Sequence, residues 1–268
     1  MSWETMRVKA TKQVDDCITL AKRYVLPWYG VSEAEFPCPI PPAVGALYTA
    51  HESSAKWRYK GKLIFAPARY ILTNYPEASL KNLTCKVGDN EVSRWNVHPY
   101  DVRSHHWAAQ QAFWEGRKYI SPYLDKYGFV EFDGLSVYDQ IVLLLLQRAV
   151  GIGCTRGLLR KASLEPGHTD YQPVKYMGVW LQRPGADTTP FDGAQTTDMV
   201  RLRYIWCSEM VLRSKELGIG DLPKALLPPL PRPATGIVPM PRDFMANMKA
   251  YSRAARNQGP MPTGPWPV

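Results

Sequence analysis

The sequence predicts a mainly α-helical protein: an irregular helical domain with long proline-rich extended segments and at most a small β-hairpin. Apolar residues repeat at helical spacing through residues 6–25. An unbroken apolar run at 141–146 is typical of a helix that is buried on all sides. Prolines mark the extended parts, and eleven of the 24 lie within residues 222–268. These three observations divide the chain into helical and extended regions.

We expect four parts along the chain. They are an N-terminal amphipathic helix at 1–26, a proline-rich extended linker at 27–42, a helical core domain at 43–221 and a proline-rich basic C-terminal extension at 222–268. The first helix should run from Glu4 to Val25, and Pro27 should end it.

Helices are also predicted in the first half of the core. The expected helices are 43–51, 54–75 with a kink or break at Pro67, 104–119 capped by Ser104, and a helix restarted by Ser121-Pro122 and closed by Gly128. Between them, residues 83–98 could form a hairpin around the turn-prone triplet Gly88-Asp89-Asn90.

The second half of the core contains the best local signals. Ser136-Val-Tyr-Asp139 resembles a capping box and should start a helix that ends at Val150. Gly151 and Gly153 should break it, with a shorter helix following to Lys161. Glycines and prolines then indicate a long irregular loop at 164–196, with a short strand at 174–181. Thr197 can cap the last core helix, which ends at Leu217 before Gly218.

Charge is concentrated in the C-terminal extension. Net charge is +9 overall, and residues 222–268 supply +5 of it, six bases minus one acid. Residues 1–221 are therefore only +4, which argues against a dedicated nucleic-acid binder. A free tail of this composition should be disordered, so we expect it to order against a partner through one amphipathic helix at 243–256.

Several functional classes lack support in the sequence. The five cysteines are scattered and form neither a disulfide framework nor a zinc motif, which favours reduced, mostly buried thiols. No stretch reaches the roughly 18 apolar residues of a transmembrane span. The basic amphipathic segment 6–25 is weakly similar to an organellar targeting helix, but Asp15 and Asp16 oppose that interpretation.

The chain shows no motif for catalysis, cofactor binding or metal binding. The best polar cluster is His98, Asp101, His105 and His106, but Pro99 and the Ser104 cap place Asp101 outside the helix, so a metal site is not expected. The glycines of 151–157 miss the nucleotide-loop spacing and follow a helix, so helix breaking and close packing explain them better. Pairs such as Cys154 with His168 are not singled out by any motif. We expect a protein that is not an enzyme.

The residues expected to bind partners are aromatic, apolar and basic side chains, the types enriched at interfaces. They are Trp57, Arg58, Tyr59, Arg232, Arg242, Phe244, Met248, Tyr251 and Trp266. A further basic run at 156–161 could contact lipid headgroups or RNA phosphates, but complementing a helix C-terminal dipole is the favoured interpretation.

In composition the chain is similar to the accessory (supernumerary) subunits of mitochondrial energy-converting complexes, which are often basic, rich in Trp and Tyr, and extended by proline-rich segments. The resemblance covers the whole chain and rests on no motif. It implies a structural subunit of a respiratory-chain or ATP synthase complex, on the matrix side or peripheral to the inner membrane. Its partners would be other subunits and anionic lipid, with RNA ranked below them.

Three other functions stay open. A mitochondrial ribosomal accessory protein would share the basic tail and contact rRNA. A protein of the ciliary microtubule lumen would share the Pro/Tyr-rich composition and bind tubulin. An enzyme would need a polar pocket near His98, His105 and His106.

Overall fold

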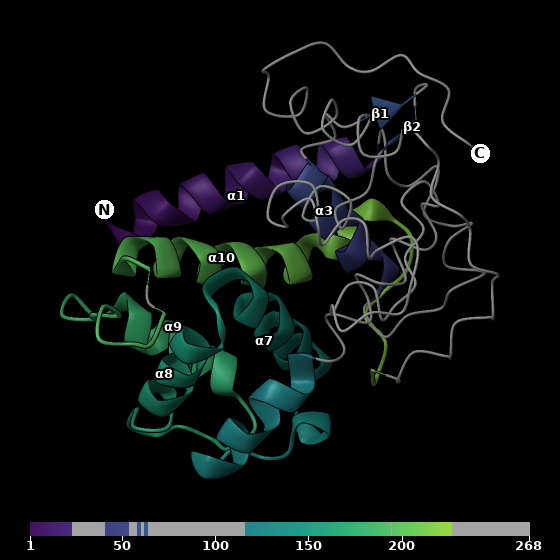
Figure 1. Ribbon diagram of the computed structural model, residues 1–268. Helices are drawn as coiled ribbons and strands as arrows, with labels where there is room; N and C mark the ends of the chain where they lie inside the picture. Colours follow the sequence, from purple (N-terminus) through teal and green to yellow (C-terminus); the bar gives the residue numbers. More distant parts are fainter. Residues whose placement is uncertain (23–40, 54–57, 60–61, 64–115, 194, 227–268) are drawn as a thin grey trace, which may run out of the picture. The chain divides into compact units, whose positions relative to one another are not determined.

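The computed structural model describes residues 1–22, 41–53, 58–59, 62–63, 116–193 and 195–226 (Figure 1). These residues are largely helical, which confirms the mainly α prediction. Contacts divide the chain into two compact units: Met1–Ile18 with Pro39–Val44 and Ala112–Pro228, and Thr19–Cys38 with Gly45–Gln111 and Pro229–Val268. Most of the described residues belong to the first unit.

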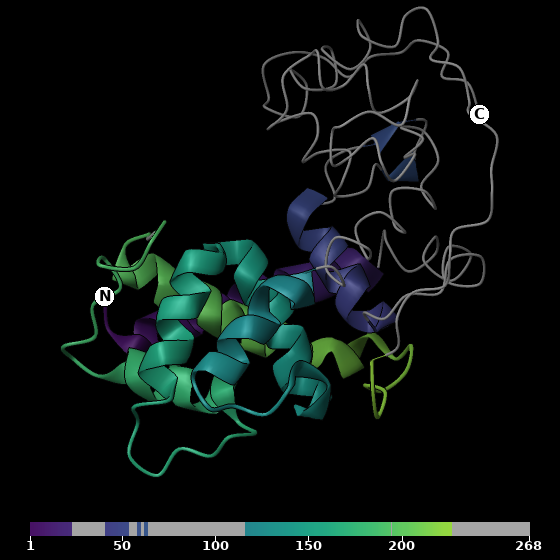
Figure 2. The ribbon, with the colours of Figure 1, turned by 60° about the horizontal axis from the view of Figure 1, so that its bottom comes forward.

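Helix α7 (Val137–Val150) is the centre of the first unit. Every residue from Asp139 to Leu146 is buried, because α8 (Ile152–Ala162), α9 (Pro173–Gln182) and α10 (Thr197–Arg213) all contact α7 (Figure 2). The apolar run at 141–146 therefore forms the core, as the sequence predicts.

The predicted start and end of α7 are both confirmed. The Ser136 hydroxyl accepts a hydrogen bond from the Asp139 N–H at 3.1 Å, which satisfies a helical donor that has no partner within the helix. Gly151 ends α7 with φ of 81°, a conformation that favours glycine, and α8 begins at the next residue.

The strand predicted at 174–181 was wrong, because that segment lies in α9, whereas the described residues on either side of α9 between 164 and 196 are irregular, as predicted. Pro173 takes the first helical position, where its missing N–H costs nothing. Val174, Met177 and Leu181 follow at helical spacing, and each is fully buried. The other glycines and prolines of this region lie outside the short helix, which contains only Pro173 and Gly178 of them.

Two further predictions about helices need correction. Ser121-Pro122 does not restart a helix, because residues 116–126 form one continuous helix in which the Ser121 hydroxyl donates to the Arg117 carbonyl. The expected helix 54–75 contains instead a two-residue antiparallel pair, β1 (Arg58–Tyr59) with β2 (Lys62–Leu63). The hairpin expected at 83–98 and the capped start at Ser104 lie outside the described residues.

Gly128 closes the helix at 116–126 as predicted. Its φ of 76° is left-handed, and its N–H bonds the Asp125 carbonyl at 3.0 Å. The next N–H, of Phe129, bonds the Leu124 carbonyl at 2.9 Å. This pair of bonds is a Schellman motif, which satisfies carbonyls at the end of the helix.

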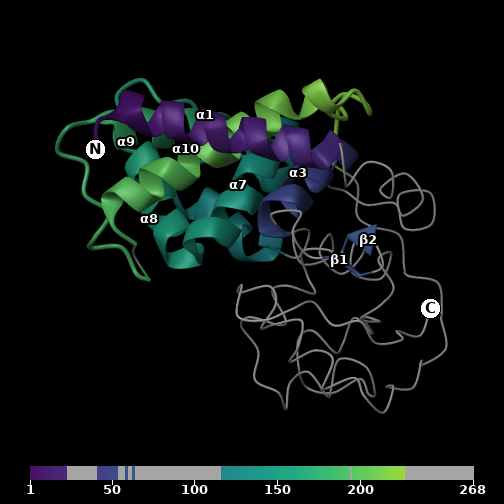
Figure 3. The same cartoon turned by 90° about the horizontal axis from the view of Figure 1, so that it is seen from above.

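Helix α1 (Trp3–Leu20) lies along α10 in the same direction (Figures 1 and 3). The Met1 amino group pairs with Asp198 at 2.9 Å near the start of α10, and Asp15 pairs with Arg213 at 2.7 Å near its end. The apolar face of α1 is buried, as its periodicity predicts: Met6, Ala10, Val14, Cys17 and Ile18.

Helix α3 (Pro42–Ser53) confirms the helix expected at 43–51, but it begins at Pro42, which the sequence assigned to the extended linker. The rest of that linker, up to residue 40, lies outside the described residues.

The start of helix α10 matches its prediction to within one residue, but the α-helix ends at Arg213, four residues before the predicted end at Leu217. Thr196, rather than Thr197, is the cap, and its hydroxyl accepts the Met199 N–H at 3.4 Å. A 3₁₀ turn (Ser214–Leu217) follows and ends at the left-handed Gly218. Within the part of the chain that the structure describes, we find no helix long and apolar enough to cross a membrane.

Candidate interaction surface

Helix α8 provides the most basic helical surface among the described residues. It carries Arg156, Arg160 and Lys161 and no acidic residue. Cys154, Leu158 and the other apolar residues of α8 face the core, so the basic residues lie on its outer side. Arg160 and Lys161 stand in the last turn, where they complement the helix dipole as the sequence analysis favours.

Two glycines bring a loop into close contact with α8. A Cβ at Gly157 would stand 2.4 Å from the Phe191 ring, and a Cβ at Gly153 would stand 2.3 Å from the Asp192 carbonyl oxygen. No side chain fits at either distance. The glycines at 151–157 therefore serve helix breaking and close packing, as the sequence analysis favoured over a nucleotide loop.

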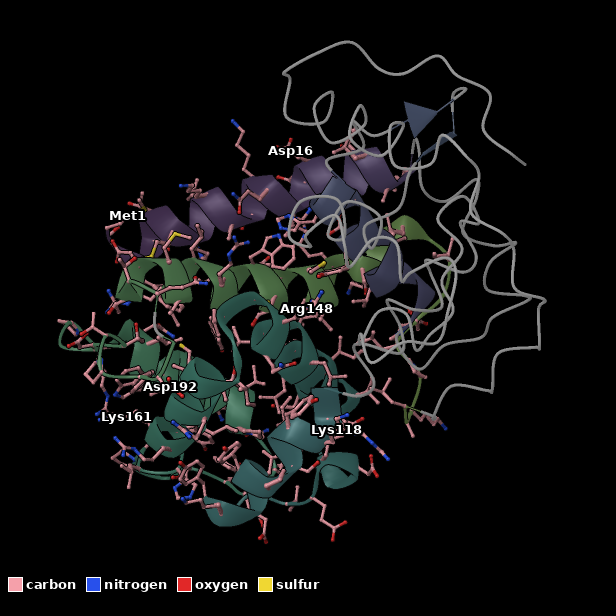
Figure 4. The ribbon with its side chains drawn as sticks, viewed as in Figure 1. Met1, Asp16, Lys118, Arg148, Lys161 and Asp192 are labelled. Atoms are coloured by element: carbon pink, nitrogen blue, oxygen red, sulfur yellow. The ribbon has the colours of Figure 1, made fainter. Side chains whose placement is uncertain are left out.

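Aromatic rings support the basic side chains of α8. The Arg156 guanidinium lies 5.6 Å from the Tyr123 ring centroid, and the Lys161 ammonium lies 5.6 Å from that of Trp180. A hydrogen bond with the Tyr123 hydroxyl raises the pKa of Arg156, so this charge persists at any physiological pH. The Asp192 carboxylate lies 3.7 Å from the Arg156 guanidinium and forms an ion pair with it (Lys161 and Asp192 are labelled in Figure 4).

The turn after α8 places one acid inside and one leucine outside. The Glu165 carboxylate is buried, with 3% of the side chain exposed, and pairs with the Arg183 guanidinium. Leu164, directly before it, is 70% exposed. We call Arg160, Lys161 and Leu164 the basic tip.

Backbone hydrogen bonds fix the conformation of this turn. The Leu164 and Glu165 amides bond the Lys161 and Ala162 carbonyls, each at 3.2 Å. Farther along, the Tyr176 hydroxyl donates to the carbonyl of Gly167 at 2.7 Å. The basic tip is thus held from both sides of the turn.

A buried polar network joins α7, α9 and α10. Asp139, 5% exposed, accepts the Ser136 hydroxyl with one carboxylate oxygen and the Val174 N–H with the other, at 3.1 Å. The Tyr204 hydroxyl donates to the Val174 carbonyl at 2.8 Å. Burial raises the pKa of Asp139, whereas these hydrogen bonds lower it. Since its acceptors are occupied by structural donors, the network positions α9.

A shallow polar depression lies along α1 and α10. Its lining residues are Glu4, Arg7, Val8, Thr11, Lys12, Asp15 and Glu209. Glu4 pairs with Arg7 at 3.0 Å and Asp15 pairs with Arg213 at 2.7 Å. These ion pairs neutralise much of the lining, which leaves no dominant charge for a ligand.

The described cysteines are buried thiols. Cys17, Cys154 and Cys207 are free, as the sequence predicts, whereas Cys38 and Cys85 lie outside the described residues. Burial raises the pKa of Cys17 to about 12 and that of Cys154 to about 11. A Cys154 thiol in this state is a poor nucleophile, so the pair with His168 gains no support.

Few of the predicted partner-binding residues lie in the described part of the chain. Arg58 and Tyr59 form β1, where Arg58 is opposite Leu63 and Tyr59 is opposite Lys62. Outside the described residues lie Trp57, Arg232, Arg242, Phe244, Met248, Tyr251 and Trp266, and the cluster His98, Asp101, His105 and His106.

Sequence reasoning found the basic run of α8 but missed the basic tip. The available signal was Leu164, an apolar residue just beyond two bases and before a turn. The inward direction of Glu165 leaves no trace in the sequence, because it depends on Arg183, eighteen residues later.

No protein-family model, curated protein or solved structure matches the chain. Among the described residues, no group of three or more His, Cys, Asp and Glu side chains could hold a metal ion. The function of this protein is therefore inferred from its own residues.

Proposed function

We propose that the chain is a non-catalytic accessory subunit of a large assembly, and that the assembly is a mitochondrial respiratory-chain or ATP synthase complex. The subunit would bind its neighbours through extended segments and sit on the matrix side of the inner membrane or peripheral to it. The observation that carries the proposal is the composition of residues 222–268, with eleven prolines and six bases against one acid.

The C-terminal extension starts from a packed position. Leu226, the last described residue, is only 8% exposed, and the core before it is built on the buried helix α7. A segment that leaves a stable core and carries aromatic and arginine anchors is suited to wrap around a neighbouring subunit. This arrangement supports adhesion as the mechanism.

The burial of Leu226 decides where the extension should be cut in a test. A chain that ends at Leu222 would lose a core contact, whereas a chain that ends at Leu226 keeps it. Native pull-down with mass spectrometry should compare the full chain with the chain ending at Leu226. Oxidative-phosphorylation subunits should be recovered with the full chain and lost on truncation.

A pair of variants tests the predicted tail helix at 243–256. Replacing Phe244, Met248 and Tyr251 by Ser removes the apolar face and should abolish recovery of the partner subunits. The control Ala246→Ser/Ala250→Ser changes the opposite side of the same predicted helix and should leave recovery intact.

Other outcomes would replace the proposal. Recovery of ribosomal proteins and RNA with steep salt dependence would indicate the ribosomal function. Recovery of tubulin would indicate the microtubule lumen. A full chain that is recovered alone, monomeric and stable would contradict assembly and direct attention to His98, His105 and His106.

A further inference from the structure

The basic tip combines two bases with the most exposed large apolar side chain among the described residues. Leu164 is 70% exposed, beyond the last turn of α8 that carries Arg160 and Lys161. The exposure of a leucine beside two cations has no role in the packing of the described core. An exposed apolar side chain next to two cations is suited to a ligand that is both apolar and anionic.

The acids nearest the basic tip in sequence and in the α8 contacts are paired with other bases. Glu165 turns inward and pairs with Arg183, and its side chain is only 3% exposed. Asp192 pairs with Arg156, one helical turn before Arg160. Arg160 and Lys161 thus present positive charge beside Leu164.

The geometry favours a lipid surface over a protein. A stable protein interface needs on the order of 1,000 Å² of complementary surface, whereas a single exposed leucine flanked by bases fits the boundary between headgroups and acyl chains. Trp180, beneath Lys161, is buried against Phe191 and supports that lysine from within the protein. Hydrogen bonds within the turn hold Leu164 outward before binding, which lowers the ordering cost.

We propose that the basic tip binds the surface of an anionic phospholipid bilayer, with Leu164 entering the headgroup layer and Arg160 and Lys161 contacting lipid phosphates. This proposal names the side of the subunit that contacts the membrane. The choice of the mitochondrial inner membrane rests on the proposed function.

Vesicle co-sedimentation of the full purified chain tests the proposal. Vesicles of phosphatidylcholine alone are compared with vesicles that also contain cardiolipin or phosphatidylserine. Arg160→Ala/Lys161→Ala should weaken binding to the anionic vesicles by roughly 25-fold, at about fivefold for each base. Leu164→Ser should weaken it roughly fivefold to tenfold by removing the apolar contact.

The matched control is Lys9→Ala/Lys12→Ala, which removes the same charge from exposed positions on α1 and should change binding less than twofold. Equal losses in the two double variants would show that only net charge matters and would overturn the proposal. Unchanged vesicle binding by Leu164→Ser would also overturn the proposal. So would a result in which Arg160→Ala/Lys161→Ala loses binding to single-stranded RNA but keeps binding to the vesicles.

Free inorganic phosphate separates the headgroup from the bilayer. Phosphate is added at the same concentration of charge as the lipid headgroups. If it releases the chain from the vesicles, the tip binds phosphate alone and the bilayer proposal fails. The vesicle assay contains no partner protein. Vesicle binding can therefore fail while the pull-down succeeds, or the reverse, so the two proposals are tested separately.

Discussion

Helices α7 and α9 are neighbours in the core, but they are held in different ways. In α7 the residues from Ile141 to Leu146 are all buried, and its cap, Ser136, lies directly before it. In α9 the buried positions are supplemented by polar contacts from distant residues: Asp139 at its N-terminal end, Tyr204 on its side and Arg201 at its C-terminal end.

Arg201 completes this clamp on α9. Its guanidinium donates to the carbonyl of Leu181 at 2.8 Å, in the last turn of α9, and to that of Arg183 at 2.9 Å, just beyond the helix. A cation at this position also complements the helix dipole. Helix α7 is therefore specified by its own sequence, whereas α9 is specified by the elements around it.

The largest expected effect is in α7. Leu144 is fully buried, so Leu144→Ala should lower the free energy of unfolding by about 2–5 kcal/mol through lost burial and a cavity. Denaturant titration measures the change. Leu212→Ala, at a position 54% exposed on α10, should cost less than about 0.5 kcal/mol. Similar costs for the two variants would contradict the placement of α7 at the centre of the core.

In α9, Gly178→Ala should cost about 3 kcal/mol, even though alanine normally favours helices over glycine. The new Cβ would stand 2.3 Å from the Tyr204 hydroxyl oxygen. Gly185→Ala has open space and should be nearly neutral by denaturant titration. The alanine at 178 should cost less in a Tyr204→Phe background, and strict additivity would disprove the contact.

Asp139→Ala should cost about 2 kcal/mol, because it leaves the Val174 N–H buried without its acceptor. Asp139→Asn keeps an acceptor for that N–H and should cost less than about 1 kcal/mol. If thermal unfolding ranks the two variants in the opposite order, the carboxylate does not hold α9 as described.

Asp139 also predicts a pH dependence of stability. Burial raises its folded-state pKa above the ordinary value of 3.8, so the folded state binds the proton more tightly than the unfolded state. Its contribution is therefore complete below the unfolded pKa and is lost as pH rises through the folded pKa. Asp139→Asn should lack this decline when unfolding is measured from acid to neutral pH. A stability difference between the two proteins that does not change with pH would contradict the raised pKa.

Arg201→Ala should cost about 1–2 kcal/mol, from two lost bonds to the end of α9. In the Arg201→Ala variant, hydrogen exchange should show faster opening at the C-terminal end of α9 than within α7. Arg201→Lys can keep one bond and should fall between the two proteins. Equal protection of α9 in all three would show that Arg201 does not clamp it.

The sequence predicted those helices whose signals are local. Ser136, the apolar run and Gly151 mark both ends and the middle of α7, and Gly128 marks the end of residues 116–126. The start of α9 was marked only by Pro173, and its other contacts join residues 20 to 35 positions apart. Such contacts follow from the fold and cannot be read from a window of neighbouring residues.

The candidate surface was predictable to the same extent. The basic run of α8 and its dipole role follow from composition and position, so the sequence revealed them. The basic tip depends on Glu165 turning toward Arg183, and the packing of the Phe191 ring against α8 depends on Gly157. Both are tertiary contacts that no residue pattern within α8 encodes.

The pairing of α1 with α10 has a consequence for synthesis in the cell. Asp15 and Arg213 are 198 residues apart, so at roughly 5–20 residues per second α1 waits on the order of 10–40 s for its partner helix. During that time the stripe of Met6, Ala10, Val14 and Ile18 has no α10 to cover it. The nascent chain therefore offers chaperones an early binding site that disappears when translation passes α10.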